Sequence, residues 1–325
     1  MVTKLDIKEF LIQSQSHPVI DVRSPHEYIH AHIPGTISLP LFSDEERTAV
    51  GTAYKQQGRQ AAMMLGLDYY GKNMQRIIAD LKLHTDSKQV YVHCWRGGMR
   101  SGVVAWMLDL FGYKVATLTG GYKSFRNWAL SSFNAPKNIV MLGGKTGSGK
   151  TEILHELKNN GEQIIDLEAI AHHKGSAFGD LGEKIIPTQE QFENDLAMEF
   201  FKLDSSARIW LEDESQRIGW VNLPNPLWRQ MRAAKVFYLN IPFEARLNYI
   251  TDCYGNFDQK RLKAATVRIQ KRLGGLNTKN ALQFFEEGKV KVLIEKTFPL
   301  SDVKEALMQL HKGRTRGKIV LTITS

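Results

Sequence analysis

Short apolar runs alternate with helical patterns along the first third of the chain, after an opening segment, 1–11, whose mixed charged and apolar residues predict a short amphipathic helix. The predicted strands are 19–22, 89–93 and 114–118, and the predicted helices are 44–57, 61–83 and 101–111. Alternating strands and helices favour a parallel sheet covered on both faces. The polar stretch 131–138 breaks this pattern and is predicted to be a linker.

A second alternating series begins directly after the linker. Strands are predicted at 139–142, 163–167, 207–211 and 235–241. Between them, apolar residues recur at three- and four-residue spacing in 188–203, which predicts a helix. The pattern therefore predicts two α/β domains in tandem, each built on a parallel sheet.

Composition and charge narrow the range of functions. The 325 residues suit two domains of about 150 residues each. The chain has 43 Lys and Arg against 34 Asp and Glu, and this net charge of +9 suggests an anionic partner such as nucleic acid or a phosphorylated substrate. Charge alone does not distinguish such a partner from an ordinary basic surface, because many proteins are mildly basic without one.

Cysteine content and hydropathy exclude further classes. The only two cysteines, Cys94 and Cys253, lie far apart in the sequence, which excludes a disulfide scaffold and a zinc site of clustered cysteines. No apolar run is long enough to cross a membrane, and none at the start has the pattern of a signal peptide. We therefore expect a cytoplasmic protein without membrane contact.

The clearest chemistry in the first domain is a loop around Cys94, which follows the apolar residues 90–92. Its further members are Arg96, Gly97, Gly98 and Arg100, and a helix is predicted to begin near Ser101. Glycines let such a loop point its amides inward at a helix N-terminus, which creates an anion site and stabilises a nucleophilic thiolate. A buried structural cysteine is the alternative, but two arginines and two glycines within six residues would make a poor core.

The first domain resembles rhodanese domains. The resemblance covers about residues 1–130 and includes the segments DVRSPHEYIHAHIPGTISLP and LTGGYKSFRNW on either side of the Cys94 loop. It implies that Cys94 carries sulfur or selenium as a persulfide or perselenide. The spacing from His93 and Cys94 to Arg100 also fits cysteine phosphatases, so the loop is expected to hold a tetrahedral phosphate-like group. That geometry suits either phosphatase chemistry or reaction with selenophosphate.

The second domain opens with a complete Walker A pattern between an apolar strand and a helix. Its predicted diphosphate-binding residues are Gly144, Gly147, Ser148, Gly149, Lys150 and Thr151. The glycines let the backbone wrap a diphosphate, Lys150 supplies positive charge, and Thr151 can reach a Mg²⁺ ion. The motif predicts a P-loop, NTPase-like sheet domain that binds a polyphosphate, without saying which one.

Carboxylates follow two strands of the second domain. Asp166 and Glu168 lie at the end of 163–167, and Asp213 lies between two glutamates after 209–211. Because the carboxyl ends of parallel strands meet at the ligand crevice, these three are candidate substrate or Mg²⁺ residues. An exposed acidic turn is about as plausible for each residue singly. No resident metal ion is predicted, and the need for Mg²⁺ is left open.

Basic residues become more frequent after residue 228. The candidates for binding a large polyanion are Arg268, Lys271 and Arg272. Runs of this kind are commonly solvated helix faces, but a phosphate site in the same domain and the net positive charge favour a polyanion.

Taken together, the motifs resemble the tRNA 2-selenouridine synthases. The resemblance covers about residues 15–288 and includes AVGTAYKQQG, CWRGGMRS, GGYKSFR, GGKTGSGKT, DLEAIAHHKGSAFG, LEDESQRIG and RIQKRLGGLNTKNAL, in this order. It implies that wobble-position 2-thiouridine in tRNA is first S-geranylated from geranyl diphosphate and then converted to 2-selenouridine with selenium from selenophosphate. Cys94 would be the catalytic thiol, with Arg96, Gly97, Gly98 and Arg100 binding selenophosphate.

The same resemblance implies the ligands and partners. Residues 144–151 would hold the prenyl diphosphate, and both selenophosphate and geranyl diphosphate would be co-substrates rather than tightly bound cofactors. The partners would be tRNA with 2-thiouridine at the wobble position and an enzyme that produces selenophosphate.

The predicted domains are a rhodanese-like domain at 1–133, a P-loop domain at 138–290 and an atypical tail at 291–325. The tail departs from the family and resembles the closing helix and strand of medium-chain quinone reductases. Two other functions remain open: a P-loop ATPase or kinase with a regulatory rhodanese module, and a rhodanese-fold cysteine phosphatase. The transferase is preferred because it uses both the reactive cysteine and the P-loop.

Overall fold

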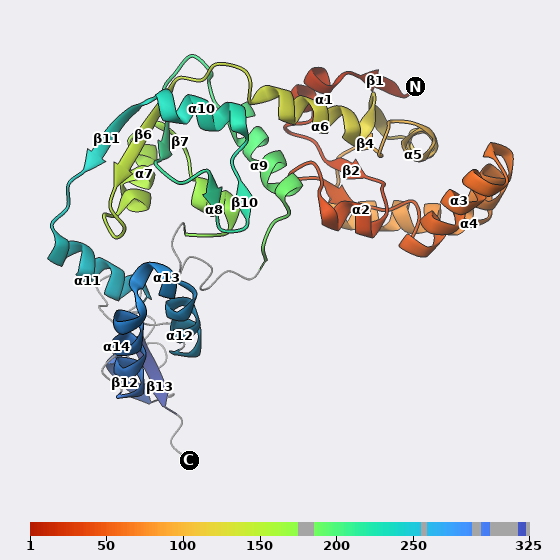
Figure 1. Ribbon diagram of the computed structural model, residues 1–325. Coiled ribbons are helices and arrows are strands. Elements are labelled where there is room, and N and C mark those ends of the chain that lie inside the picture. Colours follow the sequence, from red (N-terminus) through yellow and green to blue (C-terminus); the bar gives the residue numbers. More distant parts are fainter. Residues whose placement is uncertain (175–184, 255–258, 288–293, 300–317, 323–325) are drawn as a thin grey trace. The chain divides into compact units, whose positions relative to one another are not determined.

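The computed structural model describes residues 1–174, 185–254 and 259–287, together with the backbone of two strands at 294–299 and 318–322 (Figure 1). The chain divides into two compact units. The N-terminal unit contains 1–136, 187–204 and 224–227, and the C-terminal unit contains 137–186, 205–223 and 228–325.

The N-terminal unit is built on a five-stranded, fully parallel sheet with strand order β1-β5-β4-β2-β3. Its strands are β1 (Thr3–Leu5), β2 (Val19–Asp21), β3 (Ile37–Ser38), β4 (Gln89–His93) and β5 (Lys114–Leu118). The register places Asp21 beside His93, so both side chains come from the carboxyl ends of neighbouring strands. The parallel α/β sheet predicted for this domain is confirmed.

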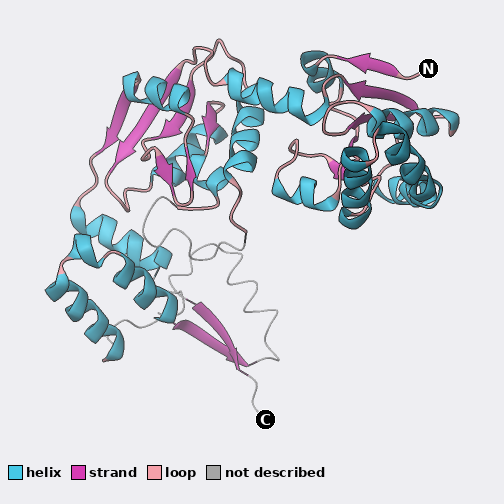
Figure 2. Cartoon of the chain, turned by 45° about the vertical axis from the view of Figure 1, so that its right-hand side comes forward, coloured by secondary structure: helices cyan, strands magenta, loops and turns pink. Residues whose placement is uncertain are grey.

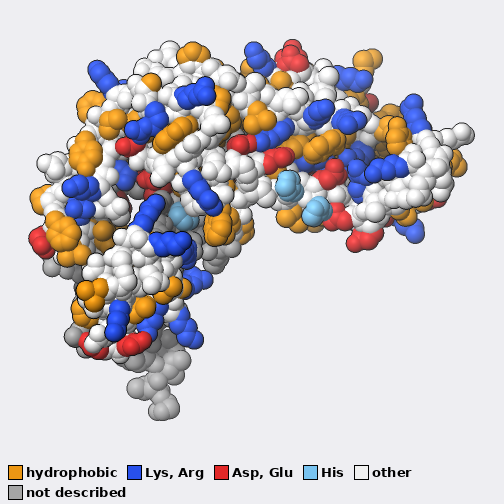
Figure 3. All heavy atoms as spheres, viewed as in Figure 1, with side chains coloured by type: hydrophobic (Ala, Val, Ile, Leu, Met, Phe, Trp, Pro, Cys, Tyr) orange, Lys and Arg blue, Asp and Glu red, His pale blue; other side chains and the backbone are white. Residues whose placement is uncertain are grey.

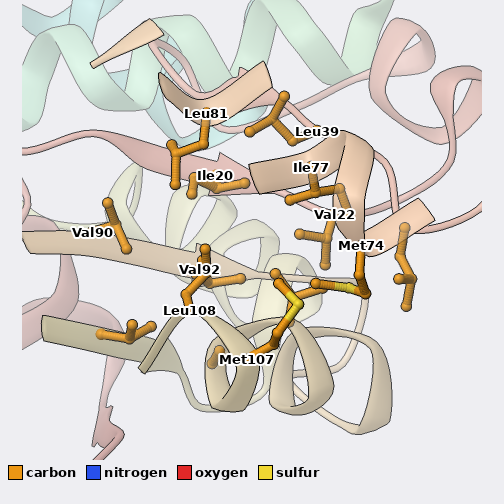
Figure 4. Packing of buried hydrophobic residues seen from close by; sticks show 14 of the residues in the cluster. Ile20, Val22, Leu39, Met74, Ile77, Leu81, Val90, Val92, Met107 and Leu108 are labelled. Atoms are coloured by element: carbon orange, nitrogen blue, oxygen red, sulfur yellow. The ribbon is translucent and has the colours of Figure 1, made fainter. Parts of the chain in front are cut away.

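Helices surround this sheet and close its core. They are α1 (Ile7–Gln13), α2 (Pro25–His30), α3 (Asp44–Gln56), α4 (Arg59–His84), α5 (Met99–Leu110), α6 (Gly121–Ser132) and α9 (Gln189–Phe201). Figure 4 shows Ile77 and Leu81 of α4 and Leu108 of α5 close to Val90 and Val92 of the central strand β4, within one buried apolar cluster. This packing fixes the end of β4, from which the Cys94 loop departs.

Two local predictions for the N-terminal unit are wrong. The opening segment is not one helix: Thr3–Leu5 forms strand β1, and Asp6 then caps α1 by accepting a hydrogen bond from the Glu9 amide. Pairing with β5 draws these residues into the sheet, which the local charge pattern does not reveal. The predicted linker at 131–138 also begins too early, because α6 continues through Ser132.

Helix α9 lies in the predicted P-loop domain by sequence but belongs to the N-terminal unit by its contacts. Arg126 of α6 forms an ion pair with Glu193, and the amide of Asn194 donates to the Tyr122 hydroxyl at 2.8 Å. Phe192 and Leu196 are fully buried. The predicted boundaries of 1–133 and 138–290 therefore differ from the observed division, because an amphipathic pattern predicts a helix but not the neighbour against which it packs.

The C-terminal unit contains a four-stranded parallel sheet with strand order β11-β6-β8-β7 (Figure 2). Its strands are β6 (Ile139–Gly144), β7 (Gln163–Ile165), β8 (Ile209–Glu212) and β11 (Lys235–Leu239), and a small antiparallel pair is formed by β9 (Arg217–Ile218) and β10 (Val221–Asn222). The other helices are α7 (Lys150–Asn159), α8 (Leu167–Ala171), α10 (Asn225–Ala233), α11 (Phe243–Tyr254), α12 (Gln259–Arg268), α13 (Gln270–Leu273) and α14 (Gly275–Glu286).

The predicted tail, 291–325, is described only in part. Strands β12 (Ile294–Pro299) and β13 (Lys318–Thr322) pair in parallel as a separate two-stranded sheet. The rest of the tail lies outside the described residues. Among the described helices, none combines the length and the apolar character that crossing a membrane requires.

Candidate functional site

Cys94 lies directly after β4, at the start of the loop that leads into α5. Its side chain is 3% exposed, and its Sγ lies 3.2 Å from the hydroxyl of Ser101, in the first turn of α5. Gly98 is the residue that immediately precedes the helix. The predicted nucleophile is therefore held at a helix N-terminus, where the helix dipole favours negative charge.

Two glycines allow this loop to pack against the start of α6. Gly97 has φ +62°, and a Cβ there would lie 2.3 Å from the carbonyl oxygen of Leu118. Gly121 has φ +59°, and a Cβ there would lie 2.3 Å from the Cys94 carbonyl oxygen. The Tyr122 amide donates to that same oxygen at 2.8 Å. Only glycine fits both positions, so the loop shape depends on close backbone contact with α6.

The two arginines of the loop have different environments. Arg100 donates to both carboxylate oxygens of Glu27, at 2.7 and 3.2 Å. Burial alone would raise the pKa of Glu27, but the hydrogen bonds and charge of Arg100 outweigh it and the pKa is lowered. Arg96 is exposed at the surface. Of the two arginines, Arg100 is the one held by a carboxylate, and its partner Glu27 comes from α2, which the sequence did not connect to the loop.

A buried polar cluster also lies behind the loop. Arg23 forms a nearly solvent-free ion pair with Asp21 at 2.6 Å, and its guanidinium stacks on the Tyr122 ring at 3.9 Å. His93 is completely buried, with Nε2 3.7 Å from Asp21. Burial lowers the pKa of His93, despite the opposing effect of Asp21, so this ring is neutral at pH 7. Asp21 and Arg23 were not among the predicted site residues, although both lie in the first quoted rhodanese-like segment.

The P-loop encloses one side of a cavity of about 540 Å³ in the C-terminal unit. All of its predicted diphosphate-binding residues line this cavity: Gly144, Gly147, Ser148, Gly149, Lys150 and Thr151. Lys150 Nζ lies 3.8 Å from Glu214, and the Ser148 hydroxyl is buried without a hydrogen-bond partner among the described residues. The P-loop backbone and Lys150 thus present donors and positive charge to one cavity.

Helix α11 closes the opposite side of the P-loop. Gly147 has φ +78°, and a Cβ there would lie 2.7 Å from the Ile250 side chain. Arg246 donates to the Thr146 carbonyl at 3.1 Å, and Tyr249 donates to Glu152. Because Tyr249, Ile250 and Cys253 also line the cavity, the site has an apolar wall in addition to its phosphate-binding loop.

Three glutamates gather at the carboxyl end of the sheet. Carboxylate oxygens of Glu168, Glu212 and Glu214 lie within 4.8 Å of one another. Burial, followed by repulsion from Glu212 and Glu214, raises the pKa of Glu168 to about 8. Burial is also the main reason that the pKa of Glu212 rises to about 7. Because three carboxylates this close together repel one another, the arrangement favours bound protons or a cation.

The predicted carboxylates have different roles in this geometry. Asp166, Glu168 and Asp213 all line the cavity. Asp166, however, caps α8 through the Ala169 amide, and Asp213 forms a 2.8 Å ion pair with Arg232. Among these three, only Glu168 joins the glutamate cluster; sequence reasoning preferred Asp213 to its neighbours Glu212 and Glu214.

The candidate tRNA-binding residues lie on α12 and α13. Arg268, Lys271 and Arg272 are all exposed. Figure 3 shows Lys and Arg side chains gathered over the α12–α14 region. The basic character predicted from sequence is therefore present on an accessible surface of the C-terminal unit.

Comparison with known proteins places both sites in one family. A model of the rhodanese-like domain matches residues 5–127, and a model of the tRNA 2-selenouridine synthase AAA domain matches residues 137–298. A tRNA 2-selenouridine synthase from Shewanella piezotolerans is 37% identical over 85% of this chain and 80% of its own length. The chain belongs to the tRNA 2-selenouridine synthase family.

Other tRNA 2-selenouridine synthases match this chain over a smaller share of their own length. The protein from Serratia proteamaculans is 41% identical over 72% of this chain, and that from Nitrosomonas europaea is 36% identical over 73%. In both cases the shared region is 63% of the relative's length. This chain thus spans less than two thirds of these two relatives.

Membership of the tRNA 2-selenouridine synthase family confirms the resemblance and the two-part α/β fold predicted from sequence. The Cys94 loop lies within the rhodanese-like match, and the P-loop and the glutamate cluster lie within the AAA-domain match. Helix α9 also lies within the AAA-domain match although it packs in the N-terminal unit.

Proposed function

We propose that this chain is a tRNA-modifying transferase that converts wobble-position 2-thiouridine to 2-selenouridine. The observation that carries the proposal is the presence, in one member of this family, of a buried thiol at a helix N-terminus and a P-loop cavity with an apolar wall. The first suits reaction with selenophosphate, and the second suits geranyl diphosphate. An ATPase or kinase would leave the thiol unused, and a phosphatase would leave the P-loop unused.

The P-loop cavity is proposed to support geranylation. The tRNA sulfur attacks C1 of the geranyl group, so that a C–S bond forms while the C–O bond breaks and diphosphate leaves with the electron pair. Lys150 and the loop amides stabilise the charge that develops on diphosphate. The apolar wall of Tyr249, Ile250 and Cys253 excludes water from the prenyl chain.

Mg²⁺ fits the residues beside the P-loop. Thr151 and the clustered Glu168, Glu212 and Glu214 provide the oxygen ligands that this ion prefers, and the Glu212 carboxylate is buried without a hydrogen bond from the described residues. When bound, the ion would neutralise charge on the diphosphate. The carboxylates would otherwise hold the protons that their raised pKa values favour.

The Cys94 loop is proposed to release selenium. Selenium in selenophosphate already has the oxidation state of selenide, so forming a perselenide on Cys94 would require an oxidant. Attack of the Cys94 thiolate on phosphorus requires none: the S–P bond forms, the P–Se bond breaks and selenide leaves. Water then hydrolyses the phosphocysteine to phosphate, and selenide displaces the geranylthiolate from C2 of the uridine. The loop that contains Cys94 and Arg100 suits the phosphoryl group in this route.

The proposed partners and location follow from this chemistry. The macromolecular substrate would be tRNA with wobble-position 2-thiouridine, bound in part by Arg268, Lys271 and Arg272, and an enzyme that makes selenophosphate would supply the selenium donor. Such a reaction takes place in the cytoplasm, where tRNA is modified.

A reconstituted reaction tests the proposal. Purified protein is incubated with thiolated tRNA, geranyl diphosphate and selenophosphate, and the nucleosides are identified by mass spectrometry. Both S-geranyl-2-thiouridine and 2-selenouridine are expected. Robust ATP hydrolysis that prenyl diphosphate does not affect, with no nucleoside conversion, would favour the ATPase. Rapid hydrolysis of an aryl phosphate without nucleoside conversion would favour the phosphatase.

A further inference from the structure

Ser101 is the polar side chain placed directly against the reacting sulfur. It is 1% exposed and lies in the first turn of α5, where the helix backbone fixes its position. Its Oγ lies 3.2 Å from Cys94 Sγ and 3.3 Å from the carbonyl oxygen of Gly98. The hydroxyl therefore has one acceptor on the loop backbone and one partner that is either a thiol or a thiolate.

This geometry satisfies both protonation states of Cys94. When Cys94 is a thiol, S–H donates to Ser101 Oγ and the serine hydroxyl donates to the Gly98 carbonyl. When Cys94 is a thiolate, the hydroxyl rotates and donates to sulfur, because a buried charge gains more from a hydrogen bond than a neutral carbonyl does. Rotation about one bond in Ser101 is sufficient for this exchange.

The charged groups around Cys94 do not replace this donor. Arg100 is held by both oxygens of Glu27, and Arg23 is held by Asp21. His93 is buried and neutral. Ser101, in contrast, contacts the sulfur itself.

We propose that Ser101 is a catalytic residue that donates a hydrogen bond to the Cys94 thiolate. It stabilises sulfur as the nucleophile, and it does so again when sulfur becomes the leaving group as water hydrolyses the phosphocysteine. The second role rests on the proposed function, whereas the first is a property of the free protein.

The pH dependence of Cys94 alkylation tests the proposal without any substrate. Iodoacetamide reacts with the thiolate, and peptide mass spectrometry measures the modification of Cys94 separately from that of Cys253. In Ser101→Ala, the pH midpoint of Cys94 alkylation should rise by about one unit, so that the rate below the midpoint falls about tenfold. Ser101→Thr keeps the hydroxyl and should keep the wild-type midpoint.

Matched variants separate hydrogen bonding from packing. Ser101→Thr and Ser101→Val have nearly the same shape and differ in the hydroxyl, so they decide the question even if Ser101→Ala does not fold. Ser132→Ala removes a helix serine that donates to a backbone carbonyl three residues earlier, as Ser101 does, and should leave Cys94 unchanged. The Cys253 peptide is the internal control and should react equally in all variants.

The outcomes are distinguishable from failure of the proposed function. Equal midpoints for Ser101→Thr and Ser101→Val would overturn the role of Ser101, whatever reaction the protein catalyses. A raised midpoint in Ser101→Val alone would support it. The proposed function instead fails if the reconstituted reaction yields no 2-selenouridine, which leaves the alkylation result intact.

Discussion

The Cys94 loop and the P-loop differ in how their polar groups are satisfied. In the first, Arg100 pairs with Glu27, Cys94 contacts Ser101 and the Cys94 carbonyl accepts from the Tyr122 amide. In the second, the Ser148 hydroxyl and the Glu212 carboxylate are buried without hydrogen-bond partners among the described residues. The groups of the Cys94 loop itself are therefore paired before a ligand arrives, although both ring nitrogens of His93 behind the loop are buried without hydrogen-bond partners among the described residues. The P-loop site, in contrast, has unpaired groups in the cavity wall that a ligand would satisfy.

The energetic consequence differs between the two units. An unsatisfied buried polar group lowers the free energy of unfolding by about 1–3 kcal/mol. A ligand that satisfies such groups at the P-loop would therefore raise the stability of the C-terminal unit. In the Cys94 loop the corresponding contacts are already made, and the unpartnered ring nitrogens of His93 lie behind the loop. We therefore expect ligands of the P-loop to stabilise the C-terminal unit more than selenophosphate stabilises the N-terminal unit.

Removing the P-loop lysine should have the largest effect. Lys150→Ala deletes the charge proposed to contact diphosphate and should weaken geranyl diphosphate binding about ten- to a hundredfold, equivalent to about 1.5–3 kcal/mol. Calorimetric titration measures the affinity. Lys158→Ala, at an exposed position of the same helix, is the matched control. Wild type should bind geranyl diphosphate more tightly than ATP, and the reverse order would contradict the proposed ligand.

The glutamate cluster provides the next test. Mg²⁺ at a concentration of about a hundredfold its Kd should stabilise the C-terminal unit by about 2.7 kcal/mol, which appears as a higher melting temperature. Glu212→Gln should reduce this increase, because it removes a buried carboxylate ligand. Glu156→Gln changes an exposed carboxylate of α7 and should show the same Mg²⁺-dependent increase in melting temperature as wild type. An equal Mg²⁺ response in both variants would rule out Glu212 as a ligand.

Charge reversal on α13 should affect tRNA binding. Lys271→Glu combined with Arg272→Glu should lower affinity about tenfold and reduce the slope of log affinity against log salt by about two, because two phosphate contacts are lost. Filter binding across a salt series measures both quantities. The charge-preserving pair Lys271→Arg and Arg272→Lys should behave like wild type. If tRNA affinity did not vary with salt concentration, the proposal that Lys271 and Arg272 bind tRNA phosphates would be wrong.

The smallest expected effect concerns His93. Burial lowers the pKa of His93 in the folded state. Below about pH 6.5, His93 therefore binds a proton more readily in the unfolded chain than in the folded protein. Its contribution to stability is therefore constant above that pH and decreases as the pH falls below it. Melting temperatures at pH 7.5 and 5.5 should differ less in His93→Gln than in wild type, and an equal difference would contradict the buried neutral ring.

The sequence predicted the P-loop better than the chemistry around it. All six P-loop residues line the cavity because their spacing along the chain determines how the backbone wraps. The pairing of Arg100 with Glu27 joins residues far apart in sequence and depends on how α2 packs beside α5. No local pattern contains that information.

The same limit applies to the acidic residues and to α9. At the end of β8, successive side chains point in different directions, so Glu212 and Glu214 face the cluster while Asp213 pairs with Arg232. The sequence showed that 188–203 is an amphipathic helix, but Asn194 and Glu193 find their partners on α6. The spacing of apolar residues along the sequence predicts the secondary structure, whereas tertiary packing determines which element a helix face contacts.

The proposed division of labour between the two sites is tested most directly with Cys94→Ala. The variant is incubated with thiolated tRNA, geranyl diphosphate and selenophosphate, and the nucleosides are measured by mass spectrometry. Because geranylation is proposed to depend on Lys150 and the P-loop, S-geranyl-2-thiouridine should accumulate at close to the wild-type rate while 2-selenouridine is absent. If a folded Cys94→Ala protein loses geranylation as completely as selenium transfer, the two sites do not act separately and the account is wrong.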